Sequence, residues 1–201
     1  MKMMKGVSLN TYLSNYSLVV LLNLLFAVLT CLEITGAQNC GPSGNVTGTQ
    51  PPPGKCNREN NSQCCKPGHR YSTFTCSPHP NHQAILTLNG FGPREDGGSE
   101  SKCDNRFHNN NTPIVALSTG WFGYRNQKRC MHNIAITGNG KTVTAMVVDE
   151  CDSTRGCDKE HAYQPPCHNN IVDASKAVWT ALGVPEGSAK YGHMHVTWVD
   201  A

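Results

Sequence analysis

Short runs of β-branched and aliphatic residues, separated by glycine, asparagine and charged residues, dominate the hydrophobic pattern from about residue 83 onward. Runs rich in valine, isoleucine and threonine are typical of strands in an all-β domain. The predicted strands are AILTL (84–88), PIVALS (113–118), NIAIT (133–137), KTVTAMVV (141–148) and HMHVTWV (193–199). Between the third and fourth runs, Gly138-Asn139-Gly140 tolerates positive φ and predicts a tight hairpin.

One segment near the C-terminus has helical periodicity. Its apolar residues recur at i, i+3, i+4, i+7 and i+8 and form a single stripe, made by Ala174, Ala177, Val178, Ala181 and Leu182. Asp173 is placed to cap the first turn. Gly183, followed by Pro185, predicts where the helix ends.

The segment before the strands has a different composition. Residues 38–80 lack hydrophobic periodicity and carry five cysteines among Gly, Pro, Asn and Ser. The run Pro51-Pro52-Pro53-Gly54 resists regular structure. We therefore predict a loop-rich arm over 38–80, held by disulfides, and a single β domain over 81–201.

Residues 1–37 have the features of a signal peptide. Lys2 and Lys5 precede an apolar stretch at 18–29, and small residues lead to a cleavage site before Gln38. The stretch is shorter than the roughly 20 residues of a stable membrane span, although a signal anchor stays as the alternative. Cleavage would remove Cys31 and leave an even set of ten cysteines, which favours disulfides in a secreted, extracellular protein. The ten are Cys40, Cys56, Cys64, Cys65, Cys76, Cys103, Cys130, Cys151, Cys157 and Cys167.

Charge and sequons add two expectations. The formal net charge of the chain is only +3, and its basic residues are spread out. A nucleic-acid partner would require a concentrated basic face, and an anionic membrane surface a cluster of cations, so neither partner is expected. Three sequons, at Asn45, Asn60 and Asn110, are candidate glycosylation sites, and the polar HNNNT surroundings favour Asn110.

The block VVDECDSTRGCDKEHAYQPPCHNNIVDASKAVWTALGVP, residues 147–185, resembles the kiwellin family of plant secreted proteins, also called ripening-related proteins. The likeness continues in PPPGKCNRENNSQCCKPG (51–68), CDNRFHNN (103–110), IVALSTGW (114–121) and HVTW (195–198), and covers essentially the whole mature chain. The resemblance implies a six-stranded double-psi β-barrel with one or two short helices, similar to barwin proteins and the first domain of expansins.

The same resemblance implies a plant defence or ripening-related protein of the apoplast. Some relatives look like binders that block secreted pathogen enzymes such as chorismate mutase, and the family has no catalytic activity as such. We therefore expect a monomer that is no enzyme, has no cofactor and binds a secreted pathogen protein. The chain departs from the usual family pattern at 94–100, which is generally richer in glycine, and at His195, where an acidic residue is common.

The alternative is a cell-wall polysaccharide binder or a weak wall-modifying protein, because related barrels host glycoside hydrolases that use two carboxylates. The candidates are Asp149 and Asp173, the latter resembling the aspartate of the His-Phe-Asp motif in expansins and family 45 hydrolases. Hydrolysis needs a proton donor with a raised pKa, whereas a carboxylate at a helix N-cap has a lowered pKa. Asn89 stands where such hydrolases keep another aspartate, and Asp96 and Asp104 follow in a segment that its Gly and Ser content predicts to be flexible. We therefore expect no hydrolysis and leave glycan binding open.

Two loops combine the residue types that favour protein recognition. The segment 120–129 contains aromatic side chains, glycine and cations, and the loop 152–168 carries mixed charge between cysteines. Trp121 is expected in the core. The candidate binding residues are Phe122, Tyr124, Arg125, Arg155, Asp158 and Lys159.

Two further residue pairs are candidates for a metal site and for a redox site, and neither is expected. His193 and His195 project to one face of a strand, but two imidazoles without a third ligand make an incomplete metal site. No metal is therefore expected. Cys64 and Cys65 are expected in two separate bridges, because a redox pair of the thioredoxin type requires Cys-x-x-Cys.

Overall fold

The computed structural model describes residues 19–21, 23, 40–79, 84–123 and 126–201. The predictions for the signal peptide (1–37), Cys31, Tyr124 and Arg125 lie outside these residues, as do the predicted domain boundaries at 37/38 and 80/81. Residues 40–201 form one compact unit. Within the described part of the chain, no helix is both long and apolar enough to cross a membrane.

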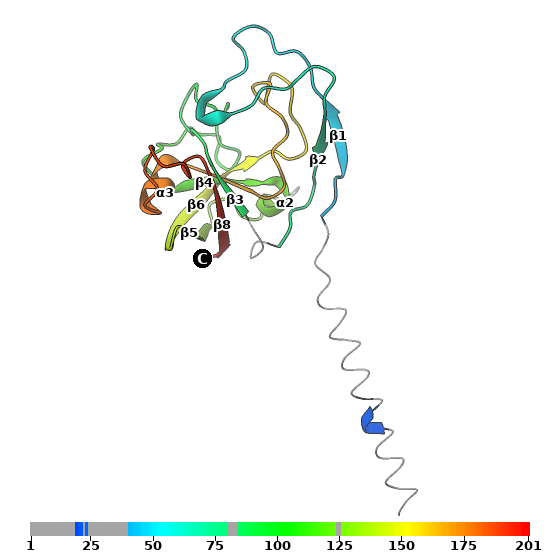
Figure 1. The fold of residues 1–201 in the computed structure, drawn as a ribbon, viewed down its shortest axis with the longest axis vertical. Helices are drawn as coiled ribbons and strands as arrows, with labels where there is room; N and C mark the ends of the chain where they lie inside the picture. The colour runs from blue at the N-terminus through cyan, green and yellow to red at the C-terminus, as the bar shows by residue number, and fades with distance from the viewer. Residues whose placement is uncertain (1–18, 22, 24–39, 80–83, 124–125) are drawn as a thin grey trace, which may run out of the picture. The chain divides into compact units, whose positions relative to one another are not determined.

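Six strands close into a barrel (Figure 1). Around the barrel the order is β3-β7-β4-β6-β5-β8, with β3–β7 and β4–β6 parallel and the other four pairs antiparallel. This closed, mixed barrel confirms the predicted double-psi class. The strands are β3 (Ala84–Leu88), β4 (Ile114–Ser118), β5 (Asn133–Gly138), β6 (Lys141–Cys151), β7 (Ile171–Ala174) and β8 (His193–Asp200).

The strands follow the hydrophobic alternation of the sequence. In β8, Met194, Val196 and Trp198 are buried while the residues between them are exposed, as the two-residue period of a strand requires. The predicted hairpin between β5 and β6 is confirmed, with Asn139 at φ 49° and Gly140 at φ 72°. Two consecutive residues with positive φ match the twist of the two strands.

The helix prediction was wrong at its start. Helix α3 (Lys176–Ala181) begins after its N-cap residue Ser175, so Asp173 is not a cap. Instead, Asp173 lies in β7, which pairs with β3 on one side and β4 on the other. Residues 171–174 form hydrogen-bonded pairs with two strands instead of joining the helix. Local periodicity gives no sign of such pairing, because both partners are distant in the chain. Gly183, at φ 74°, follows the helix as predicted.

The core fills the barrel and continues beneath the short helices. Trp179 and Trp198 are among the largest fully buried side chains, and Trp121 is 4% exposed, which confirms it as a core residue. Phe122 is 1% exposed, so its prediction as a surface contact is wrong. Helix α2 (Thr119–Phe122) continues directly from β4, and this places both aromatic side chains against the barrel core.

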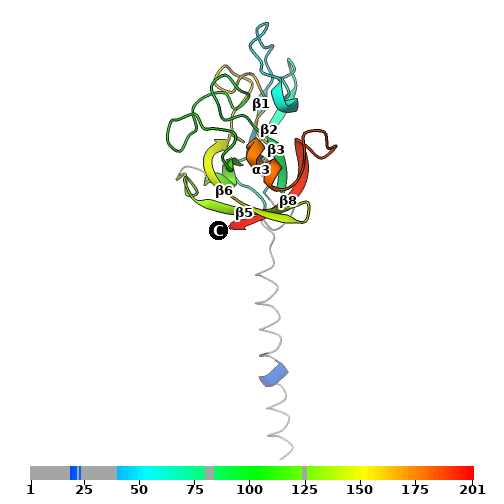
Figure 2. The same cartoon turned by 90° about the vertical axis from the view of Figure 1, so that its left-hand side faces the viewer.

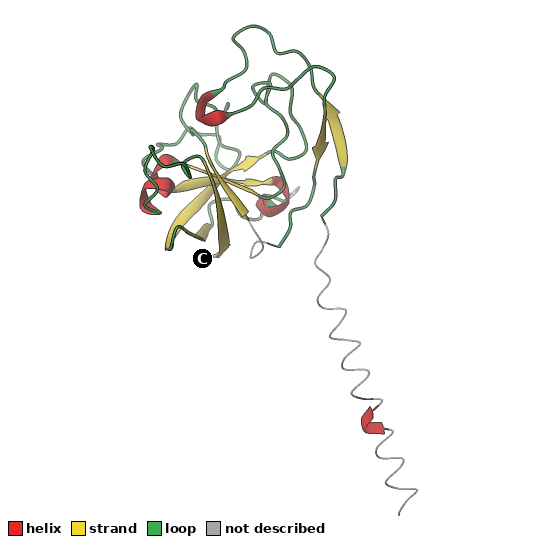
Figure 3. Cartoon of the chain, viewed as in Figure 1, coloured by secondary structure: helices red, strands yellow, loops and turns green. Residues whose placement is uncertain are grey.

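The segment before the barrel consists mainly of loops and contains a two-stranded antiparallel sheet of β1 (Gly44–Thr47) and β2 (Arg70–Thr73) and a 3-10 turn, η1 (Glu59–Asn61) (Figure 3). It lies along the barrel, because the Trp121 Nε1–H donates to the Pro78 carbonyl at 2.6 Å and the Phe74 N–H donates to the Ser153 carbonyl at 2.8 Å. Figures 1 and 2 both place η1 and the loop after β6 at the end of the barrel opposite the C-terminus.

Five disulfides use all ten described cysteines and confirm that Cys64 and Cys65 serve separate bridges. Two bridges lie within the arm and two within the barrel domain, while Cys65–Cys157 joins the arm to the loop after β6. The pairs are Cys40–Cys76, Cys56–Cys64, Cys65–Cys157, Cys103–Cys130 and Cys151–Cys167.

Candidate functional site

A cleft of about 480 Å³ lies where β4, β6 and β7 meet the surrounding loops. Barrel residues Asn89, Ala116, Asp149 and Asp173 line it together with residues of the segment 96–105 and of the loop after β6. The cleft therefore combines positions that are rigid, because they belong to paired strands, with positions on loops.

The strand register places Asp149 and Asp173 on either side of Ala116. Ala116 in β4 is the partner of Asp149 in β6 and of Asp173 in β7. Since neighbouring strands lie about 4.8 Å apart, the two aspartates have Cα atoms roughly 10 Å apart, and paired side chains share one face. The two carboxyl groups thus face the cleft with the small side chain of Ala116 between them.

Asp149 is held by the backbone. Its Oδ1 atom accepts hydrogen bonds from the Lys102 N–H at 2.8 Å and the Glu150 N–H at 2.7 Å. Burial raises the pKa of Asp149 to about 6, although both hydrogen bonds act in the opposite direction. The neighbouring Glu150 pairs with the Lys102 ammonium and accepts a hydrogen bond from the Thr119 hydroxyl at 2.5 Å.

Asp173 is half-buried at the wall of the cleft. Its Oδ1 atom accepts a hydrogen bond from the Thr87 hydroxyl at 2.7 Å. Burial raises the pKa of Asp173 to about 7, and the charges of Asp96 and Asp149 add to this effect. The expectation of a lowered pKa was therefore wrong, because it depended on a helix cap that Asp173 does not form.

Asp96 joins these two carboxyl groups, although the sequence suggested that it lies in a flexible segment. Its side chain is 6% exposed and accepts hydrogen bonds from the Gly90 N–H at 2.8 Å and the Asn60 amide at 2.9 Å. Burial raises its pKa as well. The glycine-rich sequence around Asp96 suggested a flexible segment. Its burial could not be predicted because one of its hydrogen-bond donors, Asn60, is distant in the chain.

Asn89 follows β3 and lines the same cleft. It is 8% exposed, and its main-chain N–H donates to the Ala174 carbonyl at 3.0 Å. Among the described residues, its side-chain amide has no hydrogen-bond partner. Sequence reasoning treated Asn89 only as a missing base, whereas the structure makes it a polar group that faces the cleft.

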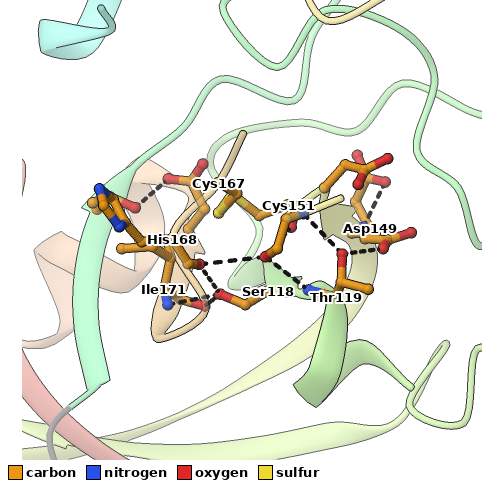
Figure 4. Close-up of a disulfide and its surroundings, with 12 residues drawn as sticks. Ser118, Thr119, Asp149, Cys151, Cys167, His168 and Ile171 are labelled. Carbon is orange, nitrogen blue, oxygen red and sulfur yellow. Dashed lines mark hydrogen bonds between the residues drawn. A yellow bond between two sulfur atoms is a disulfide. The ribbon is translucent and has the colours of Figure 1, made fainter. Parts of the chain in front are cut away.

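The loop after β6, residues 152–168, is fixed at both ends and in the middle. Cys151–Cys167 closes its base and Cys65–Cys157 ties it to the arm. The His168 carbonyl accepts hydrogen bonds from the Ser118 hydroxyl at 2.6 Å and the Ser153 hydroxyl at 3.4 Å (Figure 4). This loop is therefore a rigid element despite its irregular backbone.

A histidine clamps the same loop from within. One ring nitrogen of His161 lies 2.7 Å from Asp158 Oδ1 and the other lies 3.4 Å from Asp152 Oδ2. The hydrogen bond with Asp152 raises the pKa of His161 against the effect of partial burial, and Asp158 adds to it. Protonation of His161 therefore strengthens two contacts of this loop.

Three of the predicted binding residues lie on the surface of this loop. Arg155, Asp158 and Lys159 are exposed, and Arg155 also lines the cleft. The structure does not bring Phe122 to them, because that side chain is in the core.

The two histidines for which no metal site was expected lie together on one strand. His193 and His195 lie on the exposed face of β8, with ring centroids 6.4 Å apart. Across the described segments, no three His, Cys, Asp or Glu side chains are grouped to hold a metal ion.

Of the three sequon asparagines, Asn45 is exposed on β1. The Asn60 amide donates to Asp96, and the Asn110 amide donates to Glu95 at 2.8 Å and accepts from the Phe91 N–H at 2.9 Å. The favoured sequon thus carries an amide that is used inside the fold.

Comparisons of the sequence with known proteins agree over most of the chain. A family model described as Kiwellin-1 matches residues 20–201. Putative ripening-related protein 2 from Oryza sativa subsp. japonica is 49% identical over 168 residues, which cover 82% of this chain and 81% of that protein. Kiwellin from Actinidia chinensis var. chinensis is 49% identical over 155 residues, covering 76% and 70% of the two chains.

Solved structures resemble the chain more weakly. An expansin from Clavibacter michiganensis aligns with a TM-score of 0.42 and 18% identity, covering 59% of this chain and 49% of that one, so the chain matches about half of the expansin. Streptomyces papain inhibitor aligns with a TM-score of 0.38 and 16% identity, covering 58% and 89%. The barrel described above is defined by its own strand pairing.

Proposed function

This chain belongs to the kiwellin family of ripening-related proteins, and we propose that it is a secreted, non-enzymatic plant defence protein of the apoplast. In this proposal it binds a secreted pathogen protein, such as an enzyme of the chorismate mutase type, and inhibits it by occlusion. The protein would present rigid loops that cover a functional surface of its target.

The observation that carries the proposal is the double bracing of the loop 152–168. Ordering a flexible side chain at an interface costs about 0.5–1.5 kcal/mol, so a loop that is fixed before binding retains more of its contact energy. Here two disulfides and the His161 clamp fix the backbone, while Arg155, Asp158 and Lys159 stay exposed. Mixed exposed charge of this kind favours selection among partners and fast association.

Two features of the cleft support a binder over a hydrolase. Asn89 stands where a second carboxylate would be needed, and an amide cannot act as a base. Asp149 directs one carboxyl oxygen to two backbone N–H groups, which is a structural use of that carboxylate.

A second candidate, a cell-wall glycan binder or weak wall-modifying protein, is favoured by Asp173. A pKa raised to about 7 has the direction that a general acid requires. Against it, the described residues that line the cleft include no Trp, Tyr or Phe on which a sugar ring could stack. We therefore keep this function as the alternative.

The test is a binding and inhibition assay with the purified mature protein and a secreted pathogen chorismate mutase, run beside retention on cellulose and chitin. We expect inhibition that weakens at least about tenfold when Arg155→Glu and Lys159→Glu are combined, because reversed charges oppose the partner's surface. Lys190→Glu, an exposed site away from the loop, is the matched control. Retention on polysaccharide without capture of any secreted protein from infected apoplastic fluid would instead establish the alternative.

A further inference from the structure

The cleft concentrates negative charge in a protein whose formal net charge is +3. Glu150 is paired with Lys102 and Asp152 with His161. The other carboxyl groups deep in the cleft, those of Asp96, Asp149 and Asp173, have no ion-pair partner among the residues that the structure describes. Burial of three such groups close together is unfavourable unless a cation reaches them or they take up protons.

A second feature of the same cleft indicates a ligand independently of charge. Asn89 is 8% exposed, lines the cleft and forms no side-chain hydrogen bond within the described chain. Polar groups of a nearly buried side chain are usually paired, and an amide that opens into a cleft is placed to pair with a ligand there. A ligand in the cleft that offers donors could pair with the Asn89 side-chain oxygen and with the Oδ2 atoms of Asp149 and Asp173, whose Oδ1 atoms already accept hydrogen bonds within the fold.

We propose that the cleft receives an arginine side chain of the partner protein, an inference that rests on the proposed function. A guanidinium is planar and presents five N–H donors, so it can bind a carboxylate through two parallel hydrogen bonds and still donate to an amide oxygen. A volume of about 480 Å³ accommodates such a side chain. A lysine ammonium is a point charge and matches this spread of acceptors less well.

Two other ligand classes fit the cleft less well. A metal ion would need three or more ligands held together, and no such group exists among the described residues. A sugar ring prefers an aromatic surface, and His161 is the nearest approach to one among the described lining residues. Charge and acceptor placement therefore favour the cationic ligand.

The affinity of the cleft for arginine should increase with pH. Burial raises the pKa of Asp149 to about 6 and that of Asp173 to about 7. A bound cation favours their charged forms, so its affinity rises as pH increases from 5 to 8. The other charged groups that face these carboxyls are Asp96, Glu100, Lys102, Glu150, Asp152, Arg155, Glu160 and His161. Deprotonation of His161 at higher pH removes a positive charge from the cleft and acts in the same direction.

The probe is the peptide acetyl-Gly-Arg-Gly-amide, titrated into the mature protein and followed by NMR and calorimetry at pH 5 and pH 8. The matched controls are the same peptide with citrulline, which has nearly the same shape without the charge, and with lysine. We expect the arginine peptide to bind more tightly at pH 8, and the citrulline peptide to bind at least about tenfold more weakly. Equal affinities for arginine and citrulline, or tighter binding of cellohexaose than of arginine, would overturn the proposal.

Substitutions of cleft residues test whether the arginine peptide binds in the cleft. Asp173→Asn and Asn89→Leu should each weaken the arginine peptide by about tenfold, with Asp149→Asn as a further test if either variant unfolds. Asp104→Asn, outside the cleft, should bind like the unaltered protein. If the pathogen protein binds the cleft variants with unchanged affinity, the arginine proposal is wrong while the defence function stands. If the arginine peptide binds but no secreted protein does, the cleft chemistry stands and the defence function fails.

Discussion

At the scale of single residues, Asp173 links the cleft to the stability of the whole barrel. Its folded-state pKa of about 7 exceeds the ordinary value of 3.8. Between these values the folded state binds a proton that the unfolded chain releases, so the free energy of unfolding falls as pH rises from about 4 to 7. The raised pKa of His161 acts in the same direction, because its contribution is present below about pH 6.5 and is lost at higher pH.

We therefore predict that the protein is more stable at pH 5 than at pH 8. Asp173→Asn keeps an acceptor for Thr87 but removes the buried charge, so it should raise the free energy of unfolding at pH 8 by on the order of 2 kcal/mol and flatten the pH dependence. Chemical denaturation with the disulfides intact, followed at both pH values, measures this. A variant that lost stability at pH 8 would show that Asp173 is stabilising in its charged form.

The contacts of single asparagine side chains also determine which sequon can carry a glycan. Asn110 donates to Glu95 and accepts from the Phe91 N–H, whereas Asn45 is exposed in β1. A glycan at Asn110 would have to displace contacts of its amide, and one at Asn45 extends into solvent. In plant-expressed protein we expect peptide mass spectrometry to find a glycan on Asn45 and none on Asn110. Full occupancy of Asn110 would reverse this order.

At the scale of elements, five of the six barrel strands could be predicted from sequence, whereas β7 could not. Local alternation marks β3, β5 and β8, because each buries one face. Strand β7 has only four residues, too few to show a clear alternation, and the end of its sequence was interpreted as the start of a helix. It forms a strand because it pairs with β3 and β4, which are distant in the chain. Asp149 and Asp173 could be named from sequence as a candidate pair, but their placement on either side of Ala116 could not be predicted, because it depends on strand register rather than sequence spacing.

The disulfide between the arm and the loop after β6 should contribute more stability than the bridge within the arm. Cys65–Cys157 spans 92 residues and Cys56–Cys64 spans 8. In the chain-entropy account, their removal costs about 4–5 and about 2.5 kcal/mol, respectively. Thermal and chemical unfolding of the paired Cys→Ser variants compares them. Equal losses would indicate that the bridge across 92 residues acts mainly through native contacts.

At the scale of the whole molecule, the barrel core and the disulfides are largely separate. The buried cluster is built from strand residues and from α2 and α3, while Cys103 and Cys130 only pack against its edge. A core of this kind in about 160 residues can support a fold by burial alone. The sequence revealed the number of cysteines but not their pairing, because pairing depends on which loops the closed barrel brings together.

We expect the reduced and alkylated protein to keep the far-ultraviolet circular dichroism of its barrel and to lose binding of its partner. The loop 152–168 is fixed by two bridges, whereas the strands are stabilised by apolar burial. Circular dichroism and an affinity measurement on the same sample test both statements. Loss of the strand signal on reduction would show instead that the bridges hold the barrel itself.

The disulfides that fix the loop 152–168 also limit what a protease can remove from it. A single cut anywhere between Cys151 and Cys167 produces two chain segments that Cys151–Cys167 still joins. The new ends stay close to where the intact chain held them, and no fragment can diffuse away. A protein cut at this exposed, charged loop would therefore remain one molecule, and the cut would be visible only on a gel run under reducing conditions.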